Sequence, residues 1–208
     1  TLVADIGGGT TGIGVFVGGG LCHTAILPVG GAHLTNDIAV GLRTPIGEAE
    51  KLKVRAGAAS PEMTAEGELI EVFNVGDRQP RILPRRALCE IIEPRMAEIM
   101  GLIRAQLRRS GYGHLVPGGL VLTGGTALLS GIAQYASERL EIPARTGAPE
   151  QITGVTEAVK SPIYSTAVGL VQIGARDRSG MRLLRQTNGA MGAIGRVRGW
   201  LRAVLAGA

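Results

Sequence analysis

The stretch VADIGGGTTGIGVF, residues 3–16, consists of two apolar segments rich in Val and Ile, separated by three glycines and two threonines. This composition predicts a β-hairpin, and Asp5 stands near the end of its first strand. Glycines can adopt positive φ and let backbone N–H groups face a phosphate, while the threonines add hydroxyl donors. A glycine-rich hairpin in which Asp5 only forms the turn is the alternative. The predicted phosphate loop consists of Gly7, Gly8, Gly9 and Thr10.

Asp5 adds a charge argument to this loop. A carboxylate would be repelled by a phosphate unless a cation lay between them. We therefore predict Mg²⁺, held by Asp5 directly or through water, since Mg²⁺ commonly keeps several of its waters.

The segments around this hairpin extend it into an α/β pattern. Residues 21–30 predict a third strand of an antiparallel meander, and residues 33–42 place apolar side chains on one helical face. A second helix is expected next, with Thr44 as its cap, Pro45 at its first position and Gly57 at its C-terminal cap. The sum is an α/β core with a small α+β insertion over about residues 37–84.

The insertion and the segment after it show two further patterns. Residues 67–83 alternate like a hairpin that turns at Gly76 and Asp77. Residues 84–109 have a helical pattern in which Pro94 removes one backbone donor, so we expect a kink or break near Ile92.

The stretch VLTGGTALL, residues 121–129, repeats the order of strand and glycine turn. A helix is expected from about Thr126, and its N-terminal N–H groups would favour an anion or a ribose hydroxyl beside Gly124 and Gly125. A plain strand-to-helix connection is the alternative. Glu50 and Lys53 share a helical face, which fits an ordinary surface ion pair or a clamp on a ribose.

Charge is distributed unevenly along the chain, whose net charge is +5. Residues 1–173 are close to neutral, and the basic excess lies in the segment from residue 174 onward, so we expect only that segment to meet an anionic partner. Aromatic residues make up 3%, too few for a platform that stacks single-stranded nucleic acid. The two cysteines and three histidines show no metal-ligand spacing, and the composition predicts an intracellular protein with reduced thiols.

The last segment, residues 191–208, predicts an amphipathic helix that lies on a membrane surface. A terminal helix docked on the core is the alternative, although the polar residues 175–190 separate this segment from the rest. The apolar arc and the arginines along its border consist of Ile194, Val197, Arg198, Trp200, Leu201, Arg202, Val204 and Leu205.

Several long runs resemble a known family. DIGGGTTG, AEKLK, VLTGGTALLSG and SPIYSTAVGL resemble second-half motifs of the actin-like, RNase H-like ATPase superfamily. HTAILPVGGAHLTNDIAVGLRTPIGEAEKLKV and LCEIIEPRMAEIM are similar to the FtsA family of bacterial cell-division proteins, and the match runs over most of residues 1–174.

This resemblance implies an architecture. Residues 1–36 and 85–174 would form the second large subdomain of a nucleotide clamp, and residues 37–84 a small inserted subdomain. Residues 175–190 would be a linker before a membrane-targeting helix over 191–208. Since Thr1 already lies in a predicted strand, we expect the other half of the clamp to precede it.

The resemblance also implies roles and partners. Asp5 would position Mg²⁺ or water, Gly7 to Thr10 would form the second phosphate loop for ATP, and Glu50 and Lys53 would contact the ribose. Gly124 and Gly125 would lie on the adenosine side. Such a protein is at most a weak ATPase, and this half alone is expected to be inactive.

The implied biology is a filament-forming adaptor at the cytoplasmic face of the inner membrane at the division site. It would join filaments of FtsZ, through the C-terminal FtsZ peptide, to anionic lipid and work with other division proteins, without nucleic acid. Arg85 and Arg86 are the predicted peptide contacts, with a solvated basic face as the alternative. Other actin-like relatives remain open: a pilus-assembly adaptor, a sugar kinase or a chaperone-type ATPase.

Overall fold

The computed structural model describes residues 1–74, 79–150, 152 and 159–176. The chain divides into two units, one over Thr1–Ser165 and one from Thr166 onward. All of the predicted site residues that the structure describes lie in the first unit. The predicted membrane segment and nearly all of the predicted linker lie outside the described residues.

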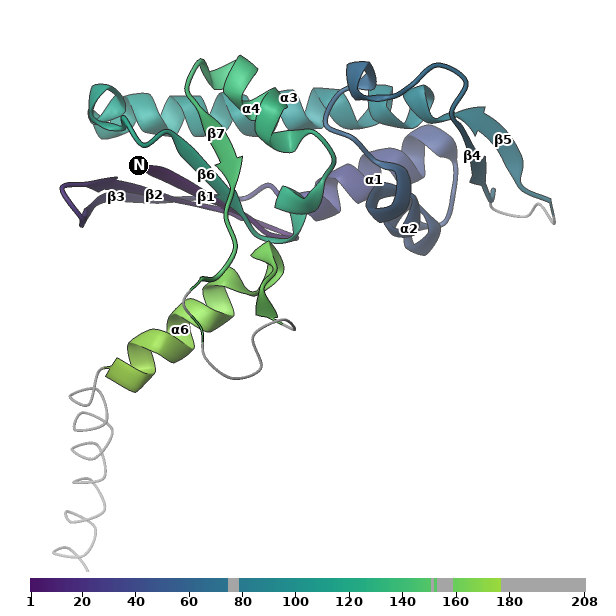
Figure 1. Cartoon of the computed structure of the whole chain (residues 1–208). Coiled ribbons are helices and arrows are strands. Elements are labelled where there is room, and N and C mark those ends of the chain that lie inside the picture. Colours follow the sequence, from purple (N-terminus) through teal and green to yellow (C-terminus); the bar gives the residue numbers. More distant parts are fainter. Residues whose placement is uncertain (75–78, 151, 153–158, 177–208) are drawn as a thin grey trace, which may run out of the picture. The chain divides into compact units, whose positions relative to one another are not determined.

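A five-stranded mixed sheet forms the centre of the first unit (Figure 1). The strands are β1 (Leu2–Ile6), β2 (Thr11–Val17), β3 (Gly20–Leu27), β6 (Leu120–Thr123) and β7 (Ala144–Thr146). Their order is β3-β2-β1-β6-β7, in which the first three strands pair antiparallel and β1, β6 and β7 pair parallel. The predicted meander is therefore confirmed, and β1 and β6 end side by side with Asp5 paired to Thr123.

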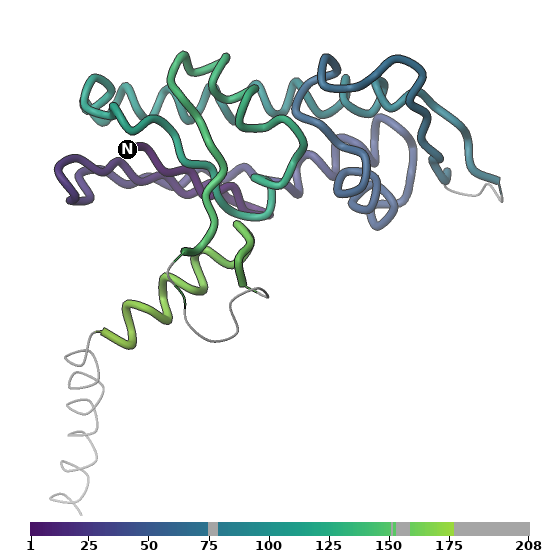
Figure 2. Tube along the Cα trace, in the orientation of Figure 1, coloured from purple at the N-terminus to yellow at the C-terminus, as the bar shows by residue number. Residues whose placement is uncertain are grey.

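Buried and more exposed side chains alternate along the strands, as expected for a sheet that packs one face against the core. In β1, Leu2, Ala4 and Ile6 are fully buried while the residues between them are only half-buried. The helix α3 (Arg85–Ser110) contributes buried residues such as Met96, Ile99 and Ile103 to the same apolar core. Figures 1 and 2 show α3 running along the whole unit, past the sheet and past the helices α1 and α2.

The helix α1 (Gly31–Leu42) packs on α2 (Ile46–Ala56) and on α3, and it buries the predicted apolar face. The strands β4 (Leu69–Val72) and β5 (Arg81–Pro84) pair antiparallel, and the predicted turn between them lies outside the described residues. The remaining elements are the helix α4 (Ile132–Leu140), the 3₁₀ turns η1 (Pro61–Met63), η2 (Gly113–Leu115), η3 (Gly125–Leu128) and η4 (Pro162–Tyr164), and the helix α6 (Ser165–Arg176).

Several local predictions were wrong. The break expected near Pro94 does not occur, because α3 is continuous over its 26 residues and a helix packed along its length tolerates one missing donor; the kink expected as the alternative stays a prediction. Pro45 is the N-cap of α2 rather than its first residue, and Thr44 donates its hydroxyl to the Phe73 carbonyl instead of capping α2. The subdomain boundary expected between residues 36 and 37 falls inside α1, and the division into large and inserted subdomains stays a prediction.

The segment after Gly124 also differs from its prediction. Residues Gly125–Leu128 form the 3₁₀ turn η3, and the α-helix begins only at Ile132. The second glycine turn therefore leads into a 3₁₀ turn and does not present an α-helix N-terminus.

Candidate functional site

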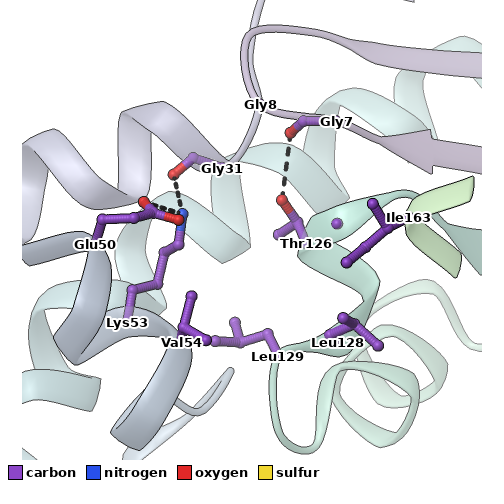
Figure 3. A pocket seen from close by; sticks show the side chains of 11 residues that line it. Gly7, Gly8, Gly31, Glu50, Lys53, Val54, Thr126, Leu128, Leu129 and Ile163 are labelled. Carbon is purple, nitrogen blue, oxygen red and sulfur yellow. Dashed lines mark hydrogen bonds and ion pairs between the residues drawn. The ribbon is translucent and has the colours of Figure 1, made fainter. Parts of the chain in front are cut away.

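Segments that are distant in sequence meet around one cavity of about 250 Å³ in the first unit (Figure 3). They are the β1–β2 turn, the beginning of α1 with one side of α2, the turn that follows β6, and η4. The cavity therefore brings together five of the residues predicted from sequence with several that were not predicted. Its lining consists of Gly7, Gly8, Gly31, Glu50, Lys53, Val54, Gly125, Thr126, Leu128, Leu129 and Ile163.

The β1–β2 turn has the predicted position but not the predicted backbone. Gly7 donates its N–H to the Thr10 carbonyl at 2.9 Å, and Gly8, Gly9 and Thr10 are exposed at the tip. The three glycines of the turn do not use the positive φ that glycine allows. A Cβ built on Gly8 or Gly9 would have no neighbour within 4 Å. Nothing within the described chain therefore requires glycine there.

Carbonyl groups of this turn bind the beginning of α1. Gly31 donates its N–H to the Gly7 carbonyl and Ala32 donates to the Gly8 carbonyl, both at 2.8 Å. These contacts satisfy N–H groups that a helix otherwise leaves unpaired in its first turn. Gly30 allows the close approach, because a Cβ on Gly30 would lie 2.5 Å from the Gly7 oxygen and 2.7 Å from the Gly8 oxygen.

Glu50 and Lys53 do not form the ordinary surface pair that spacing alone favours. The Lys53 side chain is only 12% exposed, and its Nζ donates to Glu50 Oε2 at 2.7 Å, Thr35 Oγ1 at 2.9 Å and the Gly31 carbonyl at 3.0 Å. Burial works to raise the pKa of the Glu50 carboxyl, but hydrogen bonds from Lys53 and Thr35 and the Lys53 charge outweigh it. The pKa of Glu50 therefore lies below its ordinary value, and its half-exposed carboxylate lines the cavity in the ionised form.

The second glycine turn contains two glycines with different surroundings. Gly124 has φ of +83° and donates its N–H to the Pro162 carbonyl at 3.1 Å. Its Cα lies so close to Asp5 that no side chain fits between them. A Cβ on Gly124 would lie 2.4 Å from Asp5 Oδ1. Gly125 lines the cavity, while Gly124 does not. Thr126 Oγ1 donates to the Gly7 carbonyl at 3.3 Å and so connects the two glycine turns.

Asp5 is half-buried at the end of β1 and is not part of the cavity lining. In the part of the chain that the structure describes, no group of three His, Cys, Asp or Glu residues could hold a metal ion. A Mg²⁺ ion at Asp5 would therefore take most of its ligands from water and phosphate oxygens, which suits its preference for few protein ligands. The position of Asp5 near the phosphate loop fits that arrangement.

One wall of the cavity is apolar and was not predicted. Val54, Leu128 and Ile163 are exposed hydrophobic residues, and with Leu129 they line the cavity opposite the polar groups. They come from three separate segments, α2, the turn after β6 and η4, so no spacing within one segment could have grouped them. Such a wall suits a flat apolar ring, while the polar groups suit a sugar and phosphates.

The predicted peptide contacts Arg85 and Arg86 lie in different environments. Arg85 donates to the Ala56 carbonyl at 2.7 Å and pairs with Glu68 at 2.9 Å, with a side chain that is largely buried. Arg86 is exposed and pairs with Glu90 at 3.1 Å on the same helix. Only Arg86 therefore offers its side chain to a partner.

Within the described ranges, no helix is both long enough and apolar enough to cross a membrane. The predicted lipid-contacting residues lie outside those ranges, so their part in membrane binding stays a prediction.

The sheet order and the cavity between two glycine turns define the fold of the actin-like ATPases. The chain is similar to MreB5 of Spiroplasma citri bound to ADP, with a TM-score of 0.62 and 18% identity, over 85% of this chain and 55% of that one. It is also similar to the PilM-PilN type IV pilus biogenesis complex, with a TM-score of 0.61 and 20% identity, over 83% of this chain and 45% of that one.

The family model described as "Cell division protein FtsA" matches residues 2–169, and the chain belongs to this family. It is 48% identical over 177 residues to the cell division protein FtsA of Pseudomonas aeruginosa, covering 85% of this chain and 42% of the relative. It is 40% identical over 210 residues to FtsA of Escherichia coli K12, covering 96% of this chain and 50% of the relative. The chain therefore spans half or less of the length of these curated relatives.

Proposed function

We propose that this chain forms one side of an ATP and Mg²⁺ site in a cell-division adaptor, and that residues outside the chain form the other side. The observation that carries this proposal is the cavity where the Gly7–Gly8 backbone, the Glu50 carboxylate and Gly125 meet. Glycines at 8 and 9 have space around them that the described chain does not fill, and close approach of backbone to a phosphate is a reason for such glycines.

Each part of the cavity has a role in this proposal. The exposed tip of the β1–β2 turn would meet phosphate oxygens, and the ionised Glu50 carboxylate would accept hydrogen bonds from ribose hydroxyls. The apolar wall at Val54 and Leu128 would contact the base. Bound Mg²⁺ would neutralise phosphate charge, with Asp5 orienting one of its waters. Spiroplasma citri MreB5, which shares the fold, is described as bound to ADP and to AMPPNP.

Substitution of Gly8 by valine tests the ATP proposal in the full-length protein that contains this chain. Added methyl groups would stand where phosphates approach, so we expect the affinity for a fluorescent ATP analogue with Mg²⁺ to fall at least about tenfold. Gly101→Val is the matched control, because Gly101 lies exposed on α3 and a Cβ there also has no neighbour within 4 Å. Equal affinities for both variants would reject the phosphate role of this loop.

We further propose that the protein polymerises and tethers FtsZ filaments to the cytoplasmic face of the inner membrane at the division site. The basic segment 191–208 would bind anionic lipid, because apolar residues on one arc enter the interface while arginines reach lipid phosphates. Arg86 would contribute to the dock for the acidic FtsZ peptide. Arg85 would support that dock from behind, since its guanidinium binds Ala56 and Glu68.

Co-sedimentation of FtsZ with anionic vesicles tests the tether. The full-length protein should pellet with vesicles and carry FtsZ with it, whereas a chain truncated after residue 190 should lose both activities. Arg86→Glu should keep vesicle binding but recruit several-fold less FtsZ, and Arg108→Glu, exposed near the other end of α3, is the control. Unchanged pelleting after truncation would refute the membrane role, and equal recruitment by the two arginine variants would refute the peptide role.

A further inference from the structure

One residue, Gly31, connects the polar parts of the cavity to one another through its backbone N–H and its carbonyl (Figure 3). Its N–H donates to the Gly7 carbonyl at 2.8 Å, which attaches it to the β1–β2 turn. Its carbonyl accepts from Lys53 Nζ and from Thr35 Oγ1, both at 3.0 Å. The phosphate loop and the Glu50–Lys53 pair are therefore joined by a continuous chain of hydrogen bonds through this residue.

Lys53 belongs to this chain of hydrogen bonds because its ammonium group donates to groups of the protein itself. Its ammonium has three protons, and three acceptors surround it: the Gly31 carbonyl, Thr35 Oγ1 and Glu50 Oε2. Thr35 has a single hydroxyl proton, which it donates either to the Gly31 carbonyl or to Glu50. With all its donors engaged and little surface exposed, Lys53 orients Glu50 and Gly31 rather than a ligand.

The Gly7 carbonyl is the other end of the connection. It accepts both from the Gly31 N–H and from Thr126 Oγ1, so the turn after β6 is attached to the same group. Gly31 has to be small for these contacts to coexist. A Cβ there would lie 2.5 Å from Thr126 Oγ1, 3.4 Å from Lys53 Nζ and 3.5 Å from the Gly7 oxygen.

We propose that Gly31 is a positioning residue that couples the Glu50–Lys53 pair to the phosphate loop, so that the sugar and phosphate contacts of a bound nucleotide are formed together. The identity of the ligand rests on the proposed function, whereas the coupling itself is a property of the protein without ligand. Under this proposal, Lys53 influences the Gly7–Thr10 turn although none of its hydrogen bonds goes directly to that turn.

Hydrogen exchange of the peptide covering residues 3–12, in the full-length protein without nucleotide, tests the coupling. Lys53→Met should accelerate exchange in this peptide about five- to tenfold, which corresponds to the loss of roughly one hydrogen bond. Lys51→Met is the matched control: Lys51 forms the same type of pair with Glu48 at 2.7 Å on the same helix, but its side chain is 73% exposed. Equal exchange for both variants would overturn the proposal.

Variants at Thr126, the other residue that binds the Gly7 carbonyl, give a second measurement, and neither measurement requires a substitution of Gly31 itself. Thr126→Val removes the hydroxyl that binds the Gly7 carbonyl and should accelerate exchange in the same peptide, and Thr126→Ser should restore the wild-type rate.

With the fluorescent ATP analogue, Lys53→Met and Thr126→Val should each weaken binding about fivefold. Accelerated exchange without any ATP binding by the wild-type protein would reject the proposed function and keep the coupling. ATP binding by the wild-type protein, without accelerated exchange in the variants, would reject the coupling and keep the proposed function.

Discussion

The two glycine turns at the ends of the neighbouring strands β1 and β6 look alike in sequence, but they need glycine for different reasons. Gly124 has a left-handed backbone, and a Cβ on it would collide with Asp5 and with the Ile6 backbone. Gly8 and Gly9 have neither positive φ nor a neighbour within 4 Å of an added Cβ. Packing inside the protein therefore explains glycine at position 124, whereas nothing in the described chain requires glycine at positions 8 and 9, where we propose that a ligand approaches.

The two turns border the same cavity, and composition predicted a phosphate at the first and an anion or a ribose hydroxyl at the second. The atoms that an added Cβ would meet distinguish Gly124 from Gly8 and Gly9. Gly124 has protein atoms against it, whereas Gly8 and Gly9 have open space that leaves room for a ligand.

The largest expected effect is on stability at the second turn. Gly124→Ala should lower the free energy of unfolding by about 2–4 kcal/mol, because it adds left-handed strain to a collision with backbone atoms that cannot move away. Gly9→Ala, the counterpart in the first turn, should change stability by no more than about 0.5 kcal/mol. Urea denaturation of both variants measures this, and similar losses would show that the two turns do not differ in the way inferred here.

A smaller effect is expected from pH, and it concerns the support of the first turn. The pKa of Glu50 is lower in the folded protein than its ordinary value of 4.5. The ionised form therefore stabilises the fold above that value, and this contribution is lost as the pH falls through the lowered pKa. Half of the Glu50 side chain is exposed, so solvent screens the effect and it should be well below that of Gly124→Ala.

Urea denaturation between about pH 6 and pH 3 measures this contribution. The stability of the wild-type protein should decrease more over that range than the stability of Glu50→Gln, which cannot ionise at this position. Glu48→Gln is the control, because Glu48 pairs with an exposed lysine on the same helix. Parallel curves for wild type and Glu50→Gln would contradict a stabilising role of the Glu50 charge.

Much of the fold followed from local patterns. The meander of β1 to β3 and the apolar face of α1 were predicted correctly, because alternation and helical periodicity report which face of an element is buried. The possible break at Pro94 was wrong for the opposite reason. A local rule predicted a kink or a break there, and packing along the whole length of α3 kept the helix continuous.

The candidate site likewise divides into features that local sequence patterns predicted and features that depend on packing between segments. The sequence by itself determined the candidates that we propose for binding phosphate and sugar, since glycines, a strand-end aspartate and a Glu–Lys pair have recognisable spacing. Only the tertiary structure decided that Lys53 is buried and that Gly124 serves packing. It also decided that Gly31 joins the first turn to Lys53 and that Thr126 joins the two turns. The reason is physical: a Cβ contact or a hydrogen bond across 119 residues depends on distances between segments, which local composition does not contain.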